Sequence, residues 1–112
     1  MSEMVIFTRT FDFISWLIPR LDSFPRNQRF GVTKRLQDAT LDFYETITQA
    51  NNSGGKERQN FLRQADCCLD KIRFYLRLVV RWAWLSEGQY QHAAQMVTEI
   101  GRLLGGWQKY QI

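Results

Sequence analysis

Seven apolar residues between positions 62 and 83 recur at alternating intervals of three and four residues. An α-helix completes a turn every 3.6 residues, so this spacing places their side chains on one face of a single helix. The repeat consists of Leu62, Ala65, Leu69, Ile72, Leu76, Val79 and Ala83. A helix with one apolar face draws most of its stability from packing that face, so the rest of the chain must supply partners for it.

Three other segments show the same helical spacing. Their apolar faces contain, in turn, Phe7, Phe11, Ile14, Ile18 and Leu21; Leu36, Thr40, Phe43, Ile47 and Ala50; and Tyr90, Ala93, Val97, Ile100, Leu104 and Trp107. Together with the long segment, they predict helices over about residues 2–18, 25–51, 56–85 and 87–105.

Local signals set the expected ends of these helices. Pro19 disfavours a helical conformation in the residue before it and closes the first segment, whereas Pro25 suits the first turn of the second. Ser86 and Gln89 fit a capping box, in which each side chain accepts a hydrogen bond from an open backbone N–H at the helix start. The Gly105–Gly106 pair is expected to terminate the fourth helix.

No segment alternates apolar and polar residues for long enough to predict a strand. Four amphipathic helices with short connections predict an all-α fold, an antiparallel up-down four-helix bundle that forms one domain over residues 1–112. The longest apolar-rich run, residues 74–85, is too short and too charged to cross a bilayer, so we expect no membrane association. The adjacent Cys67 and Cys68 form no disulfide framework and no secretory signal is found, so we expect a cytoplasmic protein.

Part of the third segment is apolar around its whole circumference. One face can enter the bundle core, but the other faces need a second surface. We expect that surface to be an interface between the subunits of a homo-oligomer, because exposed aromatic residues often mark interfaces. The interface candidates are Phe74, Tyr75, Leu78, Trp82 and Trp84. The alternative is extra packing against the first helix of the same subunit.

Residues that commonly carry catalysis or hold metals do not converge in the sequence. His92 is the single histidine, and we expect it to be an exposed residue of a helix. Zinc needs about four Cys or His ligands, which Cys67, Cys68 and His92 cannot supply. Phosphate-loop, dinucleotide-binding and HExxH motifs are absent. We therefore expect no enzymatic activity, no catalytic residue, no metal site and no cofactor.

Basic residues are concentrated in two stretches of a chain whose net charge is +4. Residues 20–36 contain five basic residues and one acid, and residues 71–86 contain four basic residues and no acid. Such clusters favour binding to the phosphates of RNA or DNA. The candidate nucleic-acid-binding residues are Arg20, Arg26, Arg29, Lys34, Arg35, Arg73, Arg77 and Arg81.

The arginines of the second stretch lie four residues apart and therefore share one stripe of the third helix. Like charges at this spacing repel each other weakly, and a bound phosphate backbone would turn the repulsion into attraction. The alternative is that these arginines pair with Glu45, Glu87 or Glu99 on another helix or subunit.

Four motifs give the chain a family resemblance. They are Phe-Pro-Arg-Asn-Gln-Arg-Phe at 24–30, Arg-Leu at 35–36, Lys-Ile-Arg-Phe-Tyr-Leu-Arg-Leu at 71–78 and Ile-Gly-Arg-Leu-Leu-Gly-Gly-Trp at 100–107. In these motifs the chain resembles the accessory variability determinant (Avd) proteins of diversity-generating retroelements. Those proteins share a four-helix-bundle family with proteins encoded in intervening sequences of 23S ribosomal RNA genes.

The resemblance implies a non-enzymatic accessory protein that forms a homopentameric barrel and binds a reverse transcriptase together with RNA or DNA. Such a complex supports error-prone copying of a template RNA into cDNA, which then diversifies a target gene. Arg26 and Arg29 fall in the Phe-Pro motif and Arg73 and Arg77 in the third-helix motif, while Arg81 follows by geometry alone. The alternative is a scaffold of the rRNA intervening-sequence type that binds only protein partners.

Overall fold

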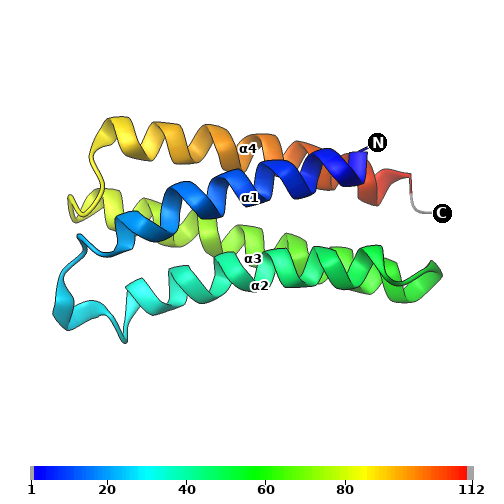
Figure 1. The fold of residues 1–112 in the computed structure, drawn as a ribbon, viewed down its shortest axis with the longest axis horizontal. Helices are drawn as coiled ribbons and strands as arrows, with labels where there is room; N and C mark the ends of the chain where they lie inside the picture. The colour runs from blue at the N-terminus through cyan, green and yellow to red at the C-terminus, as the bar shows by residue number, and fades with distance from the viewer. Residues whose placement is uncertain (1, 111–112) are drawn as a thin grey trace.

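Four α-helices run alternately up and down in the computed structural model, which describes residues 2–110 (Figure 1). They are α1 (Ser2–Leu21), α2 (Val32–Asn51), α3 (Gly55–Arg81) and α4 (Glu87–Lys109), and a short 3-10 helix, η1 (Arg26–Gln28), lies between α1 and α2. No strand occurs in the described part of the chain. The predicted all-α, antiparallel four-helix bundle is confirmed. Residues 1, 111 and 112 of the predicted domain lie outside the described residues.

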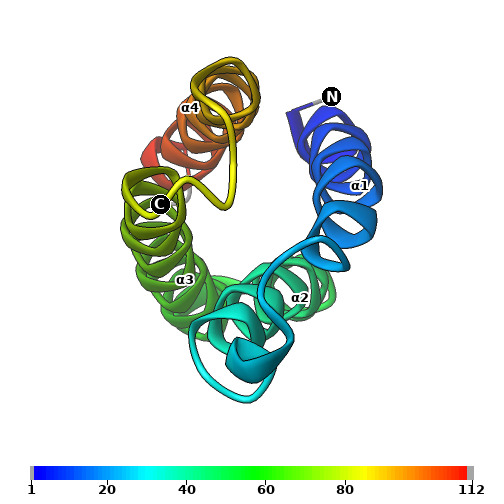
Figure 2. The same ribbon diagram turned by 90° about the vertical axis from the view of Figure 1, so that its left-hand side faces the viewer.

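The helices follow one another around the bundle in chain order, as the end-on view in Figure 2 shows. The most extensive packing joins α2 to α3, and α4 packs on α3. α1 packs on α4 and, less extensively, on α2. Each helix therefore has two neighbours, directs one face to the interior and leaves one face to the outside.

The interior contains the apolar faces that the spacing predicts for α2, α3 and α4. All five predicted positions of α2 are buried, and so are those of α3 from Leu62 to Val79 and those of α4 from Ala93 to Trp107. Only Tyr90, at the start of α4, is partly buried. Full burial of a Leu- or Phe-sized side chain contributes roughly 1.5–3 kcal/mol, so these rows are the main source of stability.

The inner face of α1 differs from the prediction. The residues that enter the core are Ile6, Thr10, Phe13, Leu17 and Leu21, of which the spacing predicted only Leu21. Phe11 is 64% exposed, and the predicted Phe7, Ile14 and Ile18 are only partly buried. α1 carries two neighbouring apolar stripes, and the neighbouring helices cover the one that the spacing did not select.

The expected end of α1 at residue 18 is also wrong, because the helix continues through Pro19 to Leu21. Proline in the last turn removes one backbone N–H from the helix. Burial of Leu21 and of Phe24 just beyond it outweighs that loss. The guanidinium of Arg20 also donates a hydrogen bond to the carbonyl oxygen of Trp16, which satisfies one acceptor of the last turn.

The expected start of the second helix at Pro25 is wrong as well. Pro25 precedes the single turn of η1, and α2 begins only at Val32. The backbone N–H of Gly31 donates to the carbonyl of Gln28 at 2.9 Å, which closes a turn between the two helices. Phe24 is buried at one end of this connection, whereas Phe30, at the other end, stands out into solvent.

α3 ends at Arg81, four residues before the predicted end at 85. The N–H of Ala83 bonds to the carbonyl of Val80, and that of Trp84 bonds to the carbonyl of Val79 at 2.8 Å. This pair of bonds is a Schellman motif, in which the residue after the C-cap adopts a left-handed conformation. Ala83 has a φ of 61° and is exposed, so it is not the core residue that the spacing predicted.

α4 begins with the predicted capping box. The N–H of Gln89 donates to Ser86 Oγ at 3.1 Å, and the N–H of Ser86 donates to Gln89 Oε1 at 3.0 Å. The expected end at 105 is wrong, because α4 continues through Gly105–Gly106 to Lys109. Each glycine disfavours the helix by about 1 kcal/mol relative to alanine. Burial of the Trp107 side chain in the core offsets this and holds the last turn in place.

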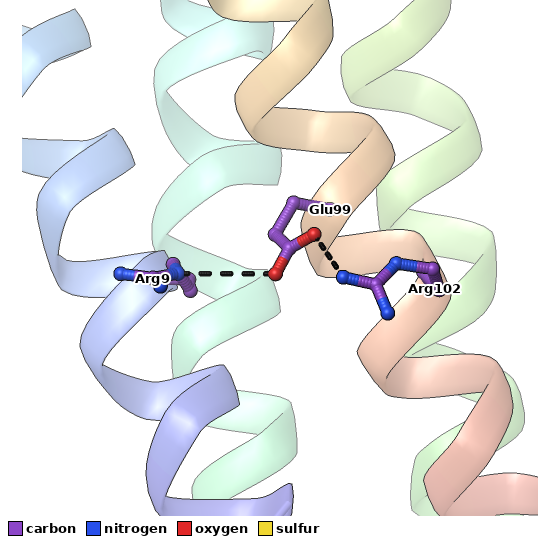
Figure 3. A network of polar contacts seen from close by, with 3 residues as sticks. All are labelled: Arg9, Glu99 and Arg102. Carbon is purple, nitrogen blue, oxygen red and sulfur yellow. Dashed lines mark hydrogen bonds and ion pairs between the residues drawn. The ribbon is translucent and has the colours of Figure 1, made fainter.

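The seam between α1 and α4 carries a small polar network (Figure 3). The carboxylate of Glu99 lies between Arg9 of α1, at 3.9 Å from Nε to Oε1, and Arg102 of its own helix. The side chains of Arg9 and Arg102 are largely exposed. Ion pairs of this kind contribute at most about 1 kcal/mol, so apolar packing rather than charge holds α1 on α4.

Replacing Gly105 by alanine is expected to stabilise the protein. The position is helical and exposed, and an added methyl group would meet no atom within 4 Å, so the change removes a glycine penalty of about 1 kcal/mol. Gly55→Ala is the matched control with the opposite sign, because Gly55 has equally open surroundings but a φ of +57°. Urea titrations followed by circular dichroism should rank Gly105→Ala above the parent and Gly55→Ala below it. The reverse order would contradict a helical Gly105.

A second comparison concerns two buried threonines. Thr10 Oγ1 has no hydrogen-bond partner among the described residues, whereas Thr40 Oγ1 donates to the carbonyl of Leu36 at 2.8 Å. Both side chains are almost completely buried. Thr10→Val should therefore raise the free energy of unfolding by about 1 kcal/mol, and Thr40→Val should leave it unchanged or lower it. Thermal unfolding of both variants measures the difference, and equal effects would show that Thr10 is hydrogen-bonded in solution.

Candidate nucleic-acid interface

The up-down topology brings the two basic stretches of the sequence to one end of the bundle. α1 ends there, η1 turns there, α2 starts there and α3 ends there, at the left-hand side of Figure 1. We call this region the basic end. It contains Arg20, Arg26, Arg29, Lys34, Arg35, Lys71, Arg73, Arg77 and Arg81.

One part of the basic end is a groove between α2 and α3, which we call the α2–α3 groove. It is lined by Phe30, Lys34, Arg35, Asp38, Ala39, Asp42, Cys68, Lys71 and Tyr75. Lys34 Nζ pairs with Asp38 Oδ2 at 2.6 Å, so one of the three cations in the groove is already neutralised. Arg35 and Lys71 come from opposite walls and form no ion pair with another described residue.

A second groove lies on the other side of α3, between α3 and α4. Its lining includes Asp70, Arg73, Arg77 and Tyr90. Arg73 Nη1 pairs with Asp70 Oδ1 at 3.0 Å. The guanidinium of Arg73 also lies against Gly101 of α4, where a methyl group would collide with it. Arg73 is thus held in place by contacts within the subunit.

Arg77 and Arg81 have no ion-pair partner within residues 5–110, and both are exposed. The alternative that Glu99 neutralises them within the subunit is excluded, because its carboxylate pairs with Arg9 and Arg102. Neither Glu45 nor Glu87 forms an ion pair with them in the described structure. These two arginines are therefore available to an anion that approaches α3.

The remaining predicted residues lie around the α1–α2 connection. The guanidinium of Arg20 stacks on the Trp16 ring at 4.2 Å from the centroid, and a hydrogen bond to the Trp16 carbonyl fixes it further. Arg26 is exposed on η1. Arg29 is exposed and lies over the Phe30 ring, 5.0 Å from its centroid. Arg20 is thus partly committed to its own helix, whereas Arg26 and Arg29 face solvent.

The predicted binding residues share an end of the bundle but not a single face. Lys34 and Arg35 belong to one groove and Arg73 and Arg77 to another. Between them lies the outer ridge of α3, by which we mean Phe74, Leu78 and Trp82. Sequence reasoning counted Lys71 in the charge of its stretch but did not select it. It also did not select Phe30, although this residue closes the Phe-Pro motif that carries Arg26 and Arg29.

The five candidates for an oligomer interface fall into two groups. Phe74 and Trp82 are 48% and 46% exposed, and Leu78 is partly exposed. Tyr75 packs against the core of its own subunit, and Trp84 packs on the buried Phe24 ring at 5.4 Å. Contacts within the subunit therefore partly bury Tyr75 and Trp84, the latter against Phe24 in the connection after α1, whereas Phe74, Leu78 and Trp82 remain open.

The comparison with protein families agrees with the fold. The model of the family described as bAvd-like matches residues 4–111. The chain belongs to the bAvd-like family. This places it at family level among Avd-type accessory proteins and confirms the resemblance inferred from the Phe-Pro and Gly-Gly-Trp motifs.

A solved structure supports the same fold for this bAvd-like chain. It is a protein of unknown function from the S23 ribosomal protein family of Bacteroides thetaiotaomicron, with a TM-score of 0.88 and 20% sequence identity. The alignment covers 97% of this chain and 99% of that one. At this identity the likeness concerns the fold alone. No curated protein matches the sequence.

The bAvd-like chain shows few groups suited to reactive chemistry. No group of three or more Cys, His, Asp or Glu side chains that could hold a metal ion occurs among the described residues. His92 is exposed and its ring lies 5.0 Å from that of Trp16. Cys67 is exposed and Cys68 half-buried, and burial raises the pKa of the Cys68 thiol. Of the helices described, none combines the length and apolar character needed to cross a membrane.

The two adjacent thiols are expected to differ in reactivity. The thiolate is the nucleophile, so the raised pKa and partial burial of Cys68 should slow its alkylation. At pH 8 the variant Cys67→Ser, which retains Cys68, should react with iodoacetamide more slowly than Cys68→Ser, which retains Cys67. The Cys68 rate should also keep rising at pH values where an ordinary thiol has levelled off. Mass spectrometry follows both rates, and equal rates at pH 8 would contradict the burial of Cys68.

Proposed function

We propose that this bAvd-like chain is a non-enzymatic accessory protein that binds RNA or DNA through its basic end. The observation that carries the proposal is the convergence of both basic stretches on one end of the bundle, where Arg77 and Arg81 find no ion-pair partner among the described residues. Unpaired arginines four residues apart on one helix repel each other. A phosphate backbone removes that repulsion and releases counterions, which makes the binding steeply salt-dependent.

The proposal includes a reverse transcriptase as the protein partner, as the resemblance to Avd proteins implies, with the complex acting in the cytoplasm during mutagenic reverse transcription. It also includes self-association into a pentameric barrel. The outer ridge of α3 supports an interface, because Phe74, Leu78 and Trp82 remain open there. Tyr75 and Trp84 are partly buried within the subunit, so only the exposed parts of their side chains can contribute to this proposed interface.

Charge reversal on α3 tests the nucleic-acid half of the proposal. Arg77→Glu with Arg81→Glu should weaken binding to a structured RNA and to duplex DNA by at least roughly tenfold at low salt. The slope of log affinity against log salt should become shallower by about 2, because two phosphate contacts are lost. Fluorescence anisotropy across a salt series measures both quantities.

A control of equal charge change lies on the same helix. Lys56→Glu with Arg63→Glu alters the net charge equally, but these exposed residues lie at the opposite end of α3. This variant should bind nearly as the parent does. If Arg77→Glu with Arg81→Glu also binds as the parent does, binding through α3 is excluded and the cations of η1 and the start of α2 become the site. Absence of binding by the parent protein at low salt refutes the nucleic-acid proposal.

The second candidate function is a scaffold that binds protein partners alone. It is favoured by the exposed Phe11 on α1, which the bundle leaves uncovered and which lines neither basic groove. A scaffold would capture a reverse transcriptase without any contribution from nucleic acid. Retention of the polymerase by the charge-reversed variant after nuclease treatment, together with no RNA binding by the parent, would favour this candidate.

A further inference from the structure

Phe30 is the most exposed of the large apolar side chains in the described structure, at 79%. It follows η1 and precedes the turn at Gly31, so it belongs neither to a core face nor to the outer ridge of α3. Keeping a phenyl ring in water forgoes the roughly 1.5–3 kcal/mol that its burial would provide. Its place among cations distinguishes it from Phe11, the other strongly exposed phenylalanine.

The surroundings of Phe30 combine aromatic faces with cations. The guanidinium of Arg29 lies 5.0 Å from the ring centroid, and the ring forms part of the α2–α3 groove together with Lys34, Arg35 and Lys71. Tyr75, from the α3 wall, adds a second aromatic ring to the same groove. Guanidinium planes and aromatic rings both stack on nucleobases, and the neighbouring cations suit phosphates.

We propose that the α2–α3 groove binds an unpaired, single-stranded stretch of nucleic acid, with a base stacked on Phe30. The inference rests on the proposed function, because it assigns the form of nucleic acid that the basic end prefers. In a duplex the faces of the bases are covered by their neighbours, so only its phosphates can use this surface. An unpaired base exposes both faces and can cover the ring.

The acids of the groove restrict how a strand lies in it. Asp38 is paired with Lys34, but Asp42 forms no ion pair within the described residues and repels phosphate. Phosphates are therefore expected beside Arg29, Arg35 and Lys71 and not at the Asp42 side of the groove. This arrangement leaves the aromatic part of the groove to a base.

The test compares one oligonucleotide in two forms. A fluorescein-labelled, unstructured 20-nucleotide DNA strand and the same strand annealed to its complement are titrated with the parent protein and with Phe30→Leu, which keeps an apolar side chain but removes the aromatic face. Phe30→Leu should weaken single-strand binding by about tenfold or more and change duplex binding by less than about twofold. Phe30→Trp should restore the single-strand affinity. A 2-aminopurine base in the strand should lose fluorescence on binding to the parent and less on binding to Phe30→Leu.

Phe11→Leu is the matched control, because Phe11 is also exposed but lies on α1 and outside the groove. It should bind both probes as the parent does. Equal weakening of both probes by Phe30→Leu, or no weakening of either, overturns the stacking proposal while leaving the basic end intact. Absence of binding to either probe overturns the proposed function itself. If Phe30→Leu binds nucleic acid normally but no longer captures a reverse transcriptase, Phe30 serves a protein contact and the inference is wrong.

Discussion

The rows of apolar side chains buried between α2 and α3 form the contact on which the rest of the molecule depends. This hairpin fixes the direction of α3 and returns its last turns to the end at which α2 begins. Lys71 therefore faces Arg35 across one groove although the two are far apart in the sequence. α1 and α4 complete the interior without changing this relation. Apolar packing therefore places the charges at one end of the bundle. No interaction between the charges themselves is needed to bring them there.

The spacing of apolar residues was sufficient to predict the buried face of three of the four helices. α2, α4 and α3 as far as Val79 turned the predicted faces inward, although the last turns of α3 also carry apolar residues on their other faces. α1 has two adjacent apolar stripes, and only the positions of α2 and α4 decide that Phe13 and Leu17 enter the core while Phe11 does not. Helix ends were less predictable. Because Leu21 and Trp107 are buried in the core, α1 continues past a proline and α4 continues past two glycines. In contrast, α3 ends in a Schellman motif whose left-handed residue is not a glycine.

The sequence predicted which stretches of the chain contribute to the candidate site. It did not predict which faces of the bundle their side chains occupy. Counting charges located both basic stretches, and the up-down topology was enough to bring them together. The spacing also separated paired from free cations on α3, because Asp70 lies three residues before Arg73, whereas no acid lies three or four residues from Arg77 or Arg81. Arg73 is engaged by Asp70 and Arg77 is not, although both occupy the same stripe. The exposure of Phe30 could not be predicted, because it depends on a turn at residues that were predicted to lie inside the second helix.

The contact between Arg73 and Gly101 couples a surface charge to the backbone of another helix. Where most residues of α4 would project a side chain, the guanidinium of Arg73 occupies the space beside Gly101. A side chain at position 101 would have to displace this guanidinium. Arg73 is therefore a packing residue of the contact between α3 and α4 as well as a cation, although a count of charges treats it as surface.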